Sequence, residues 1–435
     1  MEILAIWMAG IILERYMFNS LLPISRRHAL IFCLVLSLFE LLTYIGSDVV
    51  MPGMLSVIAD LHAEPHYVPW SLNAYLLGGV AFQWLIGPLS DRFGRRPLLL
   101  AGCALYTFSC LVTPWVSDIN LFTMLRFIQG VGLGFVVTVS YPALQEGFNE
   151  SNAIRLIAIF SNIALLSPLF GPLVGSFLLS FISWRVLFII IAALAALSWL
   201  GLLLFMPETI GVTRKDGSKI EPQPLHAGDI FRVYRDLLKN RRFMSGSTAL
   251  GLAGLPLMTW IALSPLLLVH NLGMSMLEYA LWQLPIFGSL IAGNIVLNHI
   301  AERIKIERIL TNSLFPVFAG LASALVMTLF FENIIALVVG MAIYSFGLGI
   351  CNATLYRLTL FSSEDGKGAV SAMMGMVSVS IFGLGGALLA ALGAGNSLSA
   401  YIISVFLPGI IAVLLIVYIF RDRDVDEAEV ASYSD

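Results

Sequence analysis

Charged residues are scarce in this chain. They make up 12% of its 435 residues, about half of the share that soluble globular domains carry. Hydrophobic residues make up 59%, and they come in runs of about twenty, the length that an α-helix needs to cross a bilayer. The alternating ten-residue segments of a membrane β-barrel are not the pattern here. The composition excludes a soluble globular protein and predicts an all-α membrane protein with many spans.

Metal-binding and hydrolase motifs are lacking as well. The sequence has no CxxC pair and no His/Cys cluster at metal-ligand spacing, so we expect no metal site. HExxH, GxSxG and GxGD motifs are also absent, which leaves a membrane-embedded enzyme as the least favoured function. The cysteines lie in apolar runs, where a thiol packs as a small hydrophobic group: Cys33, Cys103, Cys110 and Cys351.

Residues 1–28 form an N-terminal extension that we place in the cytoplasm. Its apolar patch at 3–12 is followed by Glu14 and Arg15. The patch is too short to span a bilayer, and it lacks the basic start and small-residue cleavage site of a signal peptide. Two interpretations stay open: the patch is an interfacial helix, or translation starts at Met17. We favour Met17, because the topology needs no extra element.

Twelve apolar runs fall into two sets of six, which predicts an internal repeat of the kind found in secondary transporters. They lie at 31–55, 69–90, 97–116, 119–145, 153–180 and 185–206, and then at 243–269, 279–299, 307–330, 334–360, 368–393 and 398–420. They define a six-helix bundle at 29–206, a polar cytoplasmic linker at 207–242, a second bundle at 243–420 and a cytoplasmic tail at 421–435. Within the linker, residues 229–240 have helical spacing and predict a surface helix.

The distribution of Lys and Arg predicts the orientation, because these residues stay in cytoplasmic loops. With the N-terminus inside, 21 of the 24 Lys and Arg residues fall in cytoplasmic segments. The exceptions are Arg15 in the extension, Arg185 on the outer side and Arg126 within a span. We therefore expect both termini and the linker to be cytoplasmic.

Two carboxylates, Glu40 and Asp48, interrupt the first span. An acid within a membrane span is costly unless it is protonated, paired or next to a wet cavity, and it is functional by default. The two acids are eight residues apart, so they lie about 80° apart around a helix and about 12 Å apart along it. Both acids therefore can face one cavity, and Tyr44, one turn from each, can share that face.

Arg126 lies about seven residues into the fourth span. Arginine stays charged, so its burial requires an anion or several acceptors. Counted from the outer surface, Arg126 and Asp48 lie at similar depths, which makes them plausible partners. The alternative is that Arg126 bonds only to backbone carbonyls and Gln129. If it pairs with Asp48, then Glu40, nearer the midplane, is the better site for a transported proton.

Two further motifs indicate conformational elements. The turn between the second and third spans reads GPLSDRFGRRP, with glycine and proline for a tight turn and with Asp91 suited to the positive end of a neighbouring helix. Its key residues are Gly87, Asp91, Arg92, Gly94 and Arg95. The fifth span reads SPLFGPLVG, and its prolines predict a bend while its glycines allow a close neighbour. The residues concerned are Pro168, Gly171, Pro172 and Gly175.

These motifs together resemble those of the major facilitator superfamily. GPLSDRFGRRP is similar to its signature loop, RFIQG to the arginine motif of proton-coupled members, and SPLFGPLVG to the motif of twelve-helix drug antiporters. FELLTYIGSDVVMPGML, AYLLGGVAFQWLIGPLSDR, QLPIFGSLIAGN and RLTLFSS resemble the MdfA-type multidrug/proton antiporters, the chloramphenicol-exporting group. The resemblance covers about residues 29–420 and implies twelve helices in two six-helix bundles.

The resemblance also implies roles for particular residues. Glu40 and Asp48 correspond to the two membrane acids of the group, Arg126 to its motif arginine and Asp91 to its loop acid. Asparagine is usual where Ser47 stands, and the eleventh span lacks the charged residues of the nearest relatives. Substrate contacts are implied at Glu40, Tyr44, Ser47, Asp48, Tyr141, Asn162 and Leu257.

The resulting expectation is an efflux antiporter of the bacterial inner membrane. It would export lipophilic neutral and cationic drugs such as chloramphenicol by alternating access, driven by the proton gradient without a cofactor. We expect a monomer that contacts lipid, drugs and protons and no nucleic acid. A proton-coupled transporter of a small metabolite is the alternative, although it would require a more polar cavity.

Overall fold

The computed structural model describes residues 20–222, 227–300, 304, 306–331, 333–363 and 367–432. Within these ranges the chain is helical, and its β-bridges are isolated pairs such as Ser20 with Phe148. The apolar patch at 3–12 and the alternative start at Met17 lie outside the described residues.

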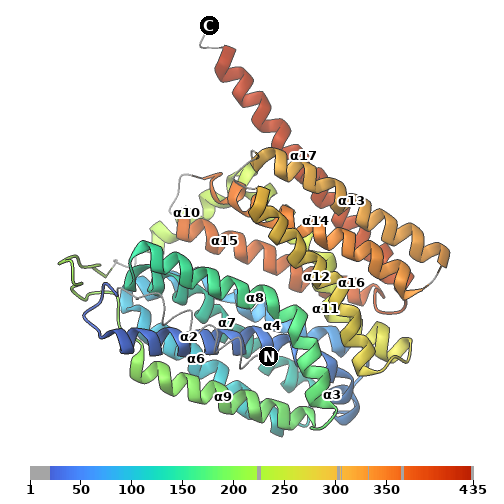
Figure 1. Cartoon of the computed structure of the whole chain (residues 1–435), viewed down its shortest axis with the longest axis horizontal. Coiled ribbons are helices and arrows are strands. Elements are labelled where there is room, and N and C mark those ends of the chain that lie inside the picture. Colours follow the sequence, from blue (N-terminus) through green and yellow to red (C-terminus); the bar gives the residue numbers. More distant parts are fainter. Residues whose placement is uncertain are drawn as a thin grey trace. The chain divides into compact units, whose positions relative to one another are not determined.

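The helices follow one another with short connections, except for the linker between Phe205 and Ala227 (Figure 1). The first half contains α2 (Arg26–Asp48), η1 (Met51–Gly53), α3 (Met54–Asp60), α4 (Tyr67–Ala81), α5 (Gln83–Phe93), α6 (Arg95–Val112), η2 (Thr113–Trp115), α7 (Ile119–Gly147), α8 (Glu150–Leu179) and α9 (Trp184–Phe205). The second half contains α10 (Ala227–Lys239), α11 (Arg241–Ser264), the π-helical η3 (Pro265–Asn271), α12 (Met276–Ile300), α13 (Ile306–Phe331), α14 (Ile334–Leu360), α15 (Lys367–Ser380), the π-helical η4 (Ile381–Gly385), α16 (Gly386–Ala391) and α17 (Leu398–Ser432).

The predicted spans are found as helices. Ten helical stretches of the described chain are long and apolar enough to cross a membrane. Helices α4 and α5, which are joined by a bend of 42°, are also long and apolar enough when they are taken together as one span. Helix α8, at the place of the fifth predicted span, completes the set of twelve. It is 30 residues long and contains a shorter apolar stretch, Leu166–Leu179. The all-α membrane fold is therefore confirmed, and α10 occupies the position predicted for a surface helix in the linker.

The first span differs from its predicted form. The sequence indicates one helix over 31–55, whereas α2 ends at Asp48 and the short η1 and α3 follow. Pro52 lies at the start of η1, and a proline cannot donate the backbone hydrogen bond that would continue the helix. Asp48 therefore lies at the end of a helix and not within one.

Several helices begin where a side chain accepts a hydrogen bond from the first turn, as helix N-caps do. Asp118 accepts from the backbone N–H of Leu121 at 2.8 Å and begins α7. Asn333 accepts from the N–H of Ala336 at 2.9 Å and begins α14. These polar residues mark the ends of spans because they satisfy backbone donors that the helix leaves unpaired.

Contacts divide the chain into two compact units. The first contains the described residues up to Asp48, Gly78–Ser167 and Ile182–Ala227, and the second contains Val49–Leu77, Pro168–Phe181 and the chain from Gly228 onward. This division differs from a simple six-plus-six split, because 49–77 and 168–181 group with the second half. The bundle boundaries predicted from the sequence stay predictions.

Glycine permits close packing of helices inside each unit. In the first unit, a Cβ on Gly132 of α7 would lie 2.7 Å from Cβ of Tyr106 on α6. In the second unit, a Cβ on Gly340 of α14 would meet the backbone of Ala324 on α13. Small residues at such positions let backbones approach each other, which is the main packing device between helices in a membrane.

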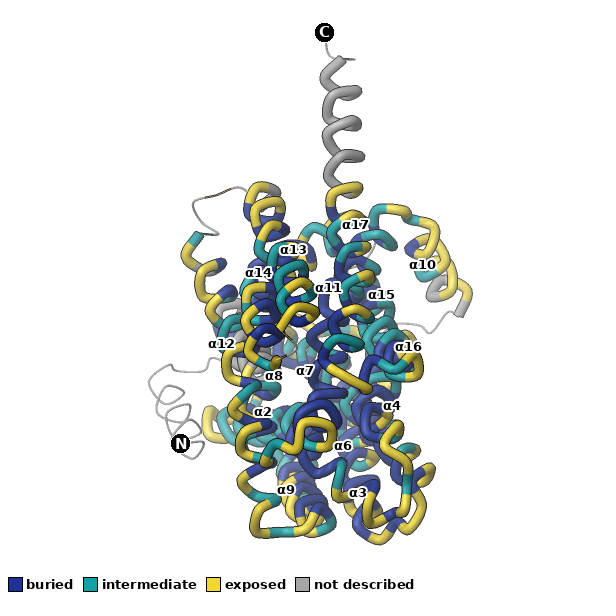
Figure 2. The backbone as a smooth tube through the Cα atoms, turned by 90° about the vertical axis from the view of Figure 1, so that its right-hand side faces the viewer, coloured by how far each residue is buried: buried dark blue, intermediate teal, exposed yellow. Residues whose placement is uncertain are grey.

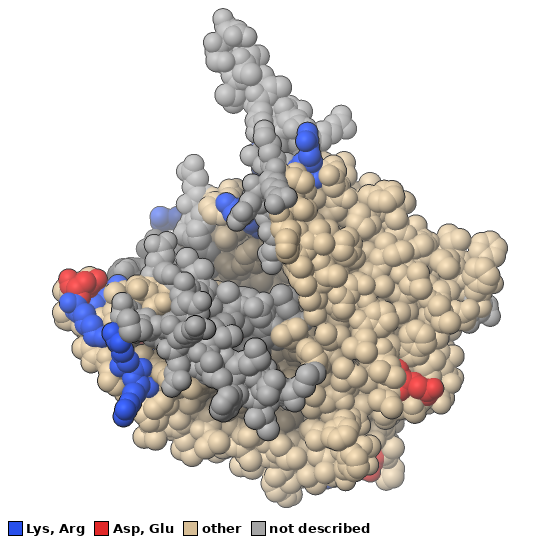
Figure 3. All heavy atoms as spheres, in the orientation of Figure 1, with Lys and Arg blue, Asp and Glu red and all other residues tan. Residues whose placement is uncertain are grey.

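The outer faces of the helices are apolar. Figure 2 shows buried and exposed residues alternating along the helices; on α9, for example, Leu202 is buried while Leu197 and Leu204 are exposed. On the face drawn in Figure 3, most of the described surface belongs to uncharged residues. Exposed leucines of this kind suit a surface in contact with lipid tails.

Candidate functional site

Glu40 lies inside the first unit on α2 and is fully buried. Tyr141 of α7 donates a hydrogen bond to Glu40 Oε1 at 3.4 Å. Among the described residues, Glu40 Oε2 has no hydrogen-bond partner. A buried carboxyl with one unsatisfied oxygen is costly when it is ionised, so this group is suited to take up a proton or a cation.

Asp48, the second acid, is also buried and has a different environment. Ser167 of α8 donates a hydrogen bond to Asp48 Oδ2 at 2.6 Å. The positive charge of Arg126 on α7 acts on the same carboxylate. The two acids therefore lie in different environments, and the different roles expected for them stay predictions.

Arg126 is 1% exposed. Its Nη1 donates to Oε1 of Gln129 at 2.7 Å, and Gln129 Nε2 donates to Oγ1 of Thr113 at 3.0 Å. The structure thus gives Arg126 the Gln129 contact considered as one alternative, together with an electrostatic influence on Asp48. Ser167 is the partner of Asp48 that the sequence reasoning missed. Its only signal in the sequence is a hydroxyl directly before Pro168 in the predicted bend.

The other predicted substrate residues lie in different places. Tyr44 is half-buried and Ser47 is buried, both on α2. Leu257 is buried on α11 in the second unit. Asn162 lies in α8, but its side chain is outside the described part of the structure. The structure thus brings Glu40 together with Tyr141, while the roles of the remaining substrate residues stay predictions.

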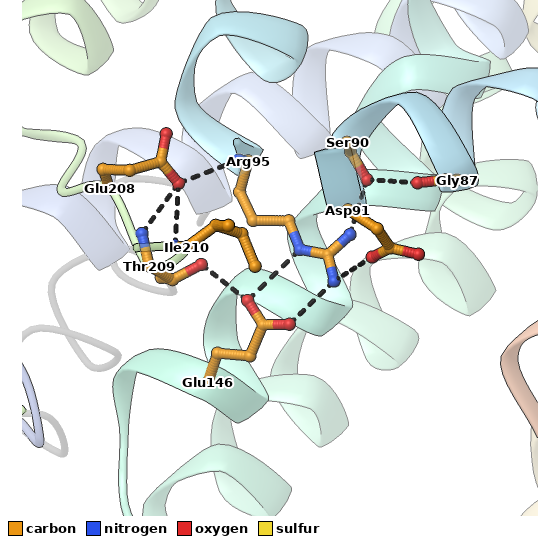
Figure 4. A network of polar contacts seen from close by, with 8 residues as sticks. All are labelled: Gly87, Ser90, Asp91, Arg95, Glu146, Glu208, Thr209 and Ile210. Atoms are coloured by element: carbon orange, nitrogen blue, oxygen red, sulfur yellow. Dashed lines mark hydrogen bonds and ion pairs between the residues drawn. The ribbon is translucent and has the colours of Figure 1, made fainter. Parts of the chain in front are cut away.

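A charge network occupies the turn between α5 and α6 (Figure 4). Arg95 Nη2 lies 2.5 Å from Asp91 Oδ1 and 2.7 Å from Glu146 Oε1. Arg95 Nη1 donates to the hydroxyl of Ser90 at 2.5 Å, and Thr209 donates to Glu146 Oε2 at 2.5 Å. The guanidinium of Arg95 is therefore surrounded by acceptors, with Glu146 at the end of the fourth span as a partner that the sequence reasoning missed.

The start of α6 is capped by an acid from the linker. Glu208 accepts hydrogen bonds from the backbone N–H groups of Arg95 at 2.9 Å and Arg96 at 3.2 Å. Within its own unit Asp91 pairs with Arg95, while Glu208 caps α6. The expected role of Asp91 at the positive end of a neighbouring helix stays a prediction. Gly94 has a φ of +104°, and the Glu208 carboxylate occupies the space that a Cβ there would need.

The other residues of the turn have simpler environments. The carbonyl of Gly87 accepts a hydrogen bond from Ser90 Oγ at 2.8 Å. Arg92 is exposed in the last turn of α5. Their proposed part in conformational change stays a prediction.

The proline- and glycine-containing segment lies in α8. Pro168 and Pro172 are inside the helix, where each removes a backbone donor. A Cβ on Gly175 would lie 3.0 Å from the carbonyl carbon of Val49, within the second unit. Gly171 is buried on the same helix. The segment therefore combines weakened helical bonding with close backbone contact.

No group of three His, Cys, Asp or Glu side chains in the described part of the chain could hold a metal ion. The four cysteines are buried free thiols, as predicted for core residues.

Comparisons with known proteins agree with this fold. Residues 36–390 match the family model described as Major Facilitator Superfamily. The D-xylose–proton symporter has a similar fold, with a TM-score of 0.69 and 15% sequence identity over 90% of this chain and 97% of that one. A bacterial homologue of the human lysosomal transporter Spinster has a TM-score of 0.67 and 14% sequence identity, over 91% of this chain and 96% of that one. The chain belongs to the major facilitator superfamily and is a multi-pass membrane protein.

Relatives with a higher sequence identity to this chain are multidrug transporters. The chain is 43% identical to the multidrug transporter MdfA of Yersinia pestis bv. Antiqua over 370 residues, which are 84% of this chain and 88% of that protein. It is 45% identical to the multidrug transporter MdfA of Edwardsiella ictaluri over 360 residues, which are 82% and 86% of the two chains.

Proposed function

We propose that this protein is a proton-coupled multidrug efflux antiporter of the bacterial inner membrane. It exports lipophilic neutral and cationic drugs such as chloramphenicol by alternating access, as a secondary active transporter that works as a monomer. It uses the proton gradient and no cofactor, and both of its termini are cytoplasmic. The names of its relatives and the resemblance of its motifs support this proposal.

The observation that carries the proposal is the environment of Glu40. Its carboxyl is fully buried, and Oε2 has no hydrogen-bond partner among the described residues. An ionised carboxylate in that position lacks compensation. Either a proton or the positive charge of a drug would neutralise it, so the two compete for one group. Such competition is the requirement for an antiporter that exchanges protons for cations.

Asp48 and Arg126 are proposed as the coupling element. The charge of Arg126 acts on Asp48, which also accepts a hydrogen bond from Ser167. A proton that binds Asp48 removes one charge of this arrangement and changes the balance between conformations, because a ligand shifts an equilibrium by its differential affinity for the two states.

The test measures transport in inverted vesicles that carry the full chain. A proton gradient is imposed, and uptake of neutral chloramphenicol and cationic tetraphenylphosphonium is followed. The wild-type protein should accumulate both. Glu40→Gln, which keeps the shape of the side chain but not its charge, should lose accumulation of the cation. The matched control is Glu278→Gln at the exposed start of α12, where Glu278 accepts a hydrogen bond from Ser275; its transport should equal wild type.

Two results would overturn the proposal. Gradient-driven uptake of the cation by Glu40→Gln at the wild-type rate would remove Glu40 from the mechanism. Failure of the wild-type protein to transport either compound, with transport of sugars or amino acids instead, would favour the metabolite transporter.

A further inference from the structure

Asp48 and Ser167 lie where two helical segments pass from one compact unit to the other. Asp48 is the last residue of the first unit on its segment, and Val49 begins a stretch of the second unit. Ser167 is likewise the last residue of the first unit in α8, and Pro168 begins a stretch of the second. The hydroxyl of Ser167 donates to Asp48 Oδ2 at 2.6 Å. The two crossing points are thus joined by a short hydrogen bond between buried side chains.

Both backbones are weakly bonded at these points. Helix α2 ends at Asp48 and the short η1 follows. In α8, Pro168 directly follows Ser167 and has no backbone N–H to donate, so one helical hydrogen bond is missing. Proline is the usual cause of a bend in a long helix. The side-chain bond between Ser167 and Asp48 therefore connects two segments whose own backbone bonding is interrupted.

Beyond the crossing points, the same two segments meet again within the second unit. Gly175 of α8 lies against the backbone of Val49, where a Cβ would come 3.0 Å from the carbonyl carbon of Val49. The contact at Gly175 depends on shape and does not change with protonation. The bond between Ser167 and Asp48 involves an acid, so its strength depends on whether that acid is ionised.

We propose that Ser167 is a positioning residue that ties the coupling acid Asp48 to the proline-containing segment of α8; this inference rests on the proposed function. An ionised Asp48 accepts a charge-assisted hydrogen bond from Ser167, which is about twice as strong as a neutral one. When Asp48 takes up a proton, that bond weakens and the link between the two crossing points loosens. Proton binding is thereby transmitted to α8.

Other charged or titratable groups of the first unit lie close enough to this pair, or to Arg126, to matter for the test. Arg126 of α7 acts electrostatically on Asp48, and it also acts on the thiol of Cys110 on α6. Glu40 lies on the same helix as Asp48, two turns away. The test must therefore separate the effect of Ser167 from a general disturbance of this charged region.

The experiment measures gradient-driven chloramphenicol uptake in inverted vesicles from pH 5.5 to 8.5. Ser167→Ala removes the donor, and Ser167→Thr restores a hydroxyl. The control is Ser176→Ala, because Ser176 is a buried serine of the same helix whose hydroxyl has no hydrogen-bond partner among the described residues. Loss of a hydrogen bond to a charged acceptor corresponds to a shift of the uptake midpoint by about one pH unit.

The midpoint of the uptake profile of Ser167→Ala should move to higher pH by about one unit, because the ionised acid loses its donor and protonation persists to higher pH. Ser167→Thr and Ser176→Ala should stay near the wild-type midpoint, and the affinity of the purified variants for chloramphenicol at a fixed pH should stay within about twofold. If Ser167→Ala does not reach the membrane, Ser167→Cys, a weaker donor, is measured in its place.

An unchanged midpoint for Ser167→Ala with normal uptake would overturn the inference, as would equal loss of rate in Ser167→Ala and Ser176→Ala without a shift. Both results leave the proposed function intact. Absence of proton-driven uptake by the wild-type protein would instead overturn the proposed function and the inference with it.

Discussion

The carboxylate of Glu208 accepts a hydrogen bond from the backbone N–H of Arg95 at 2.9 Å, although the two residues are 113 positions apart. Arg95 is the first residue of α6, and Glu208 follows the end of α9. The same carboxylate accepts from the N–H groups of Thr209 and Ile210 at 2.8 and 3.1 Å. A negative charge at the start of a helix interacts favourably with the helix dipole. The beginning of the linker is thus part of the folded first unit.

Replacing Glu208 should therefore destabilise the protein. Glu208→Ala removes both the charge and the acceptor at the start of α6, and helix caps contribute about 1 kcal/mol. We expect a lower Tm in detergent, measured by scanning fluorimetry of the purified chain. The control is Glu221→Ala, because Glu221 forms an exposed ion pair with Lys219 at 2.9 Å. An equal Tm for the two variants would show that the Glu208 contact contributes nothing.

Gly94→Ala should be more harmful than the same change at another glycine with a positive φ. Gly94 has a φ of +104°, and Gly217 in the linker has a φ of +82°. A positive φ strains a residue with a Cβ by about 1–3 kcal/mol, so both substitutions should lower the Tm. Only Gly94 faces the Glu208 carboxylate, whereas nothing lies within 4 Å of a Cβ at Gly217.

The double variant with Glu208→Ala separates the two effects at Gly94. Once the carboxylate is gone, Gly94→Ala should lower the Tm by less than it does in the wild-type chain, because the effects of substitutions at interacting sites are not additive. Additive losses of Tm would mean that backbone conformation alone explains the requirement for glycine.

The sequence predicted the spans well because a membrane helix is recorded in one continuous apolar run. Helix α14, predicted at 334–360, has those bounds in the structure. The acids Glu40 and Asp48 could also be recognised, since a charge within such a run is unusual. In contrast, the contacts of Glu208 with Arg95 and of Ser167 with Asp48 join residues more than 100 positions apart. No local pattern records such pairs. The break after Asp48 is a different case, because Pro52 is a local signal that lies within the apolar run.

The linker should be more accessible to protease when Lys215 is replaced. Lys215 Nζ donates to the carbonyls of Ser20 at 3.0 Å and Ile24 at 3.3 Å, and its backbone N–H donates to Leu21 at 2.7 Å. Lys215→Ala keeps the backbone bond but removes the two side-chain bonds. We expect faster cleavage within 207–222 by a protease of broad specificity, followed by mass spectrometry.

The control for this prediction is Lys219→Ala in the same linker. Lys219 pairs with Glu221 on the surface, and exposed pairs of this kind contribute little. Its cleavage rate should match wild type. Identical rates for Lys215→Ala and wild type would show that the backbone bond alone holds this part of the linker.

Glu146→Gln should destabilise the first unit more than Asp91→Asn does. Both acids pair with Arg95, but the side chain of Glu146 is 15% exposed and that of Asp91 is 40% exposed. Removing a charge from a buried pair leaves the remaining charge without compensation, so we expect a loss of about 2 kcal/mol or more for Glu146→Gln. For Asp91→Asn we expect about 1 kcal/mol or less, because exposed pairs are screened by water.

Tm values in detergent at low and high salt would check this order. The larger loss should persist at 1 M salt, since ions screen buried pairs much less than exposed ones, and a loss that disappears at high salt would place the Arg95–Glu146 pair among the surface interactions.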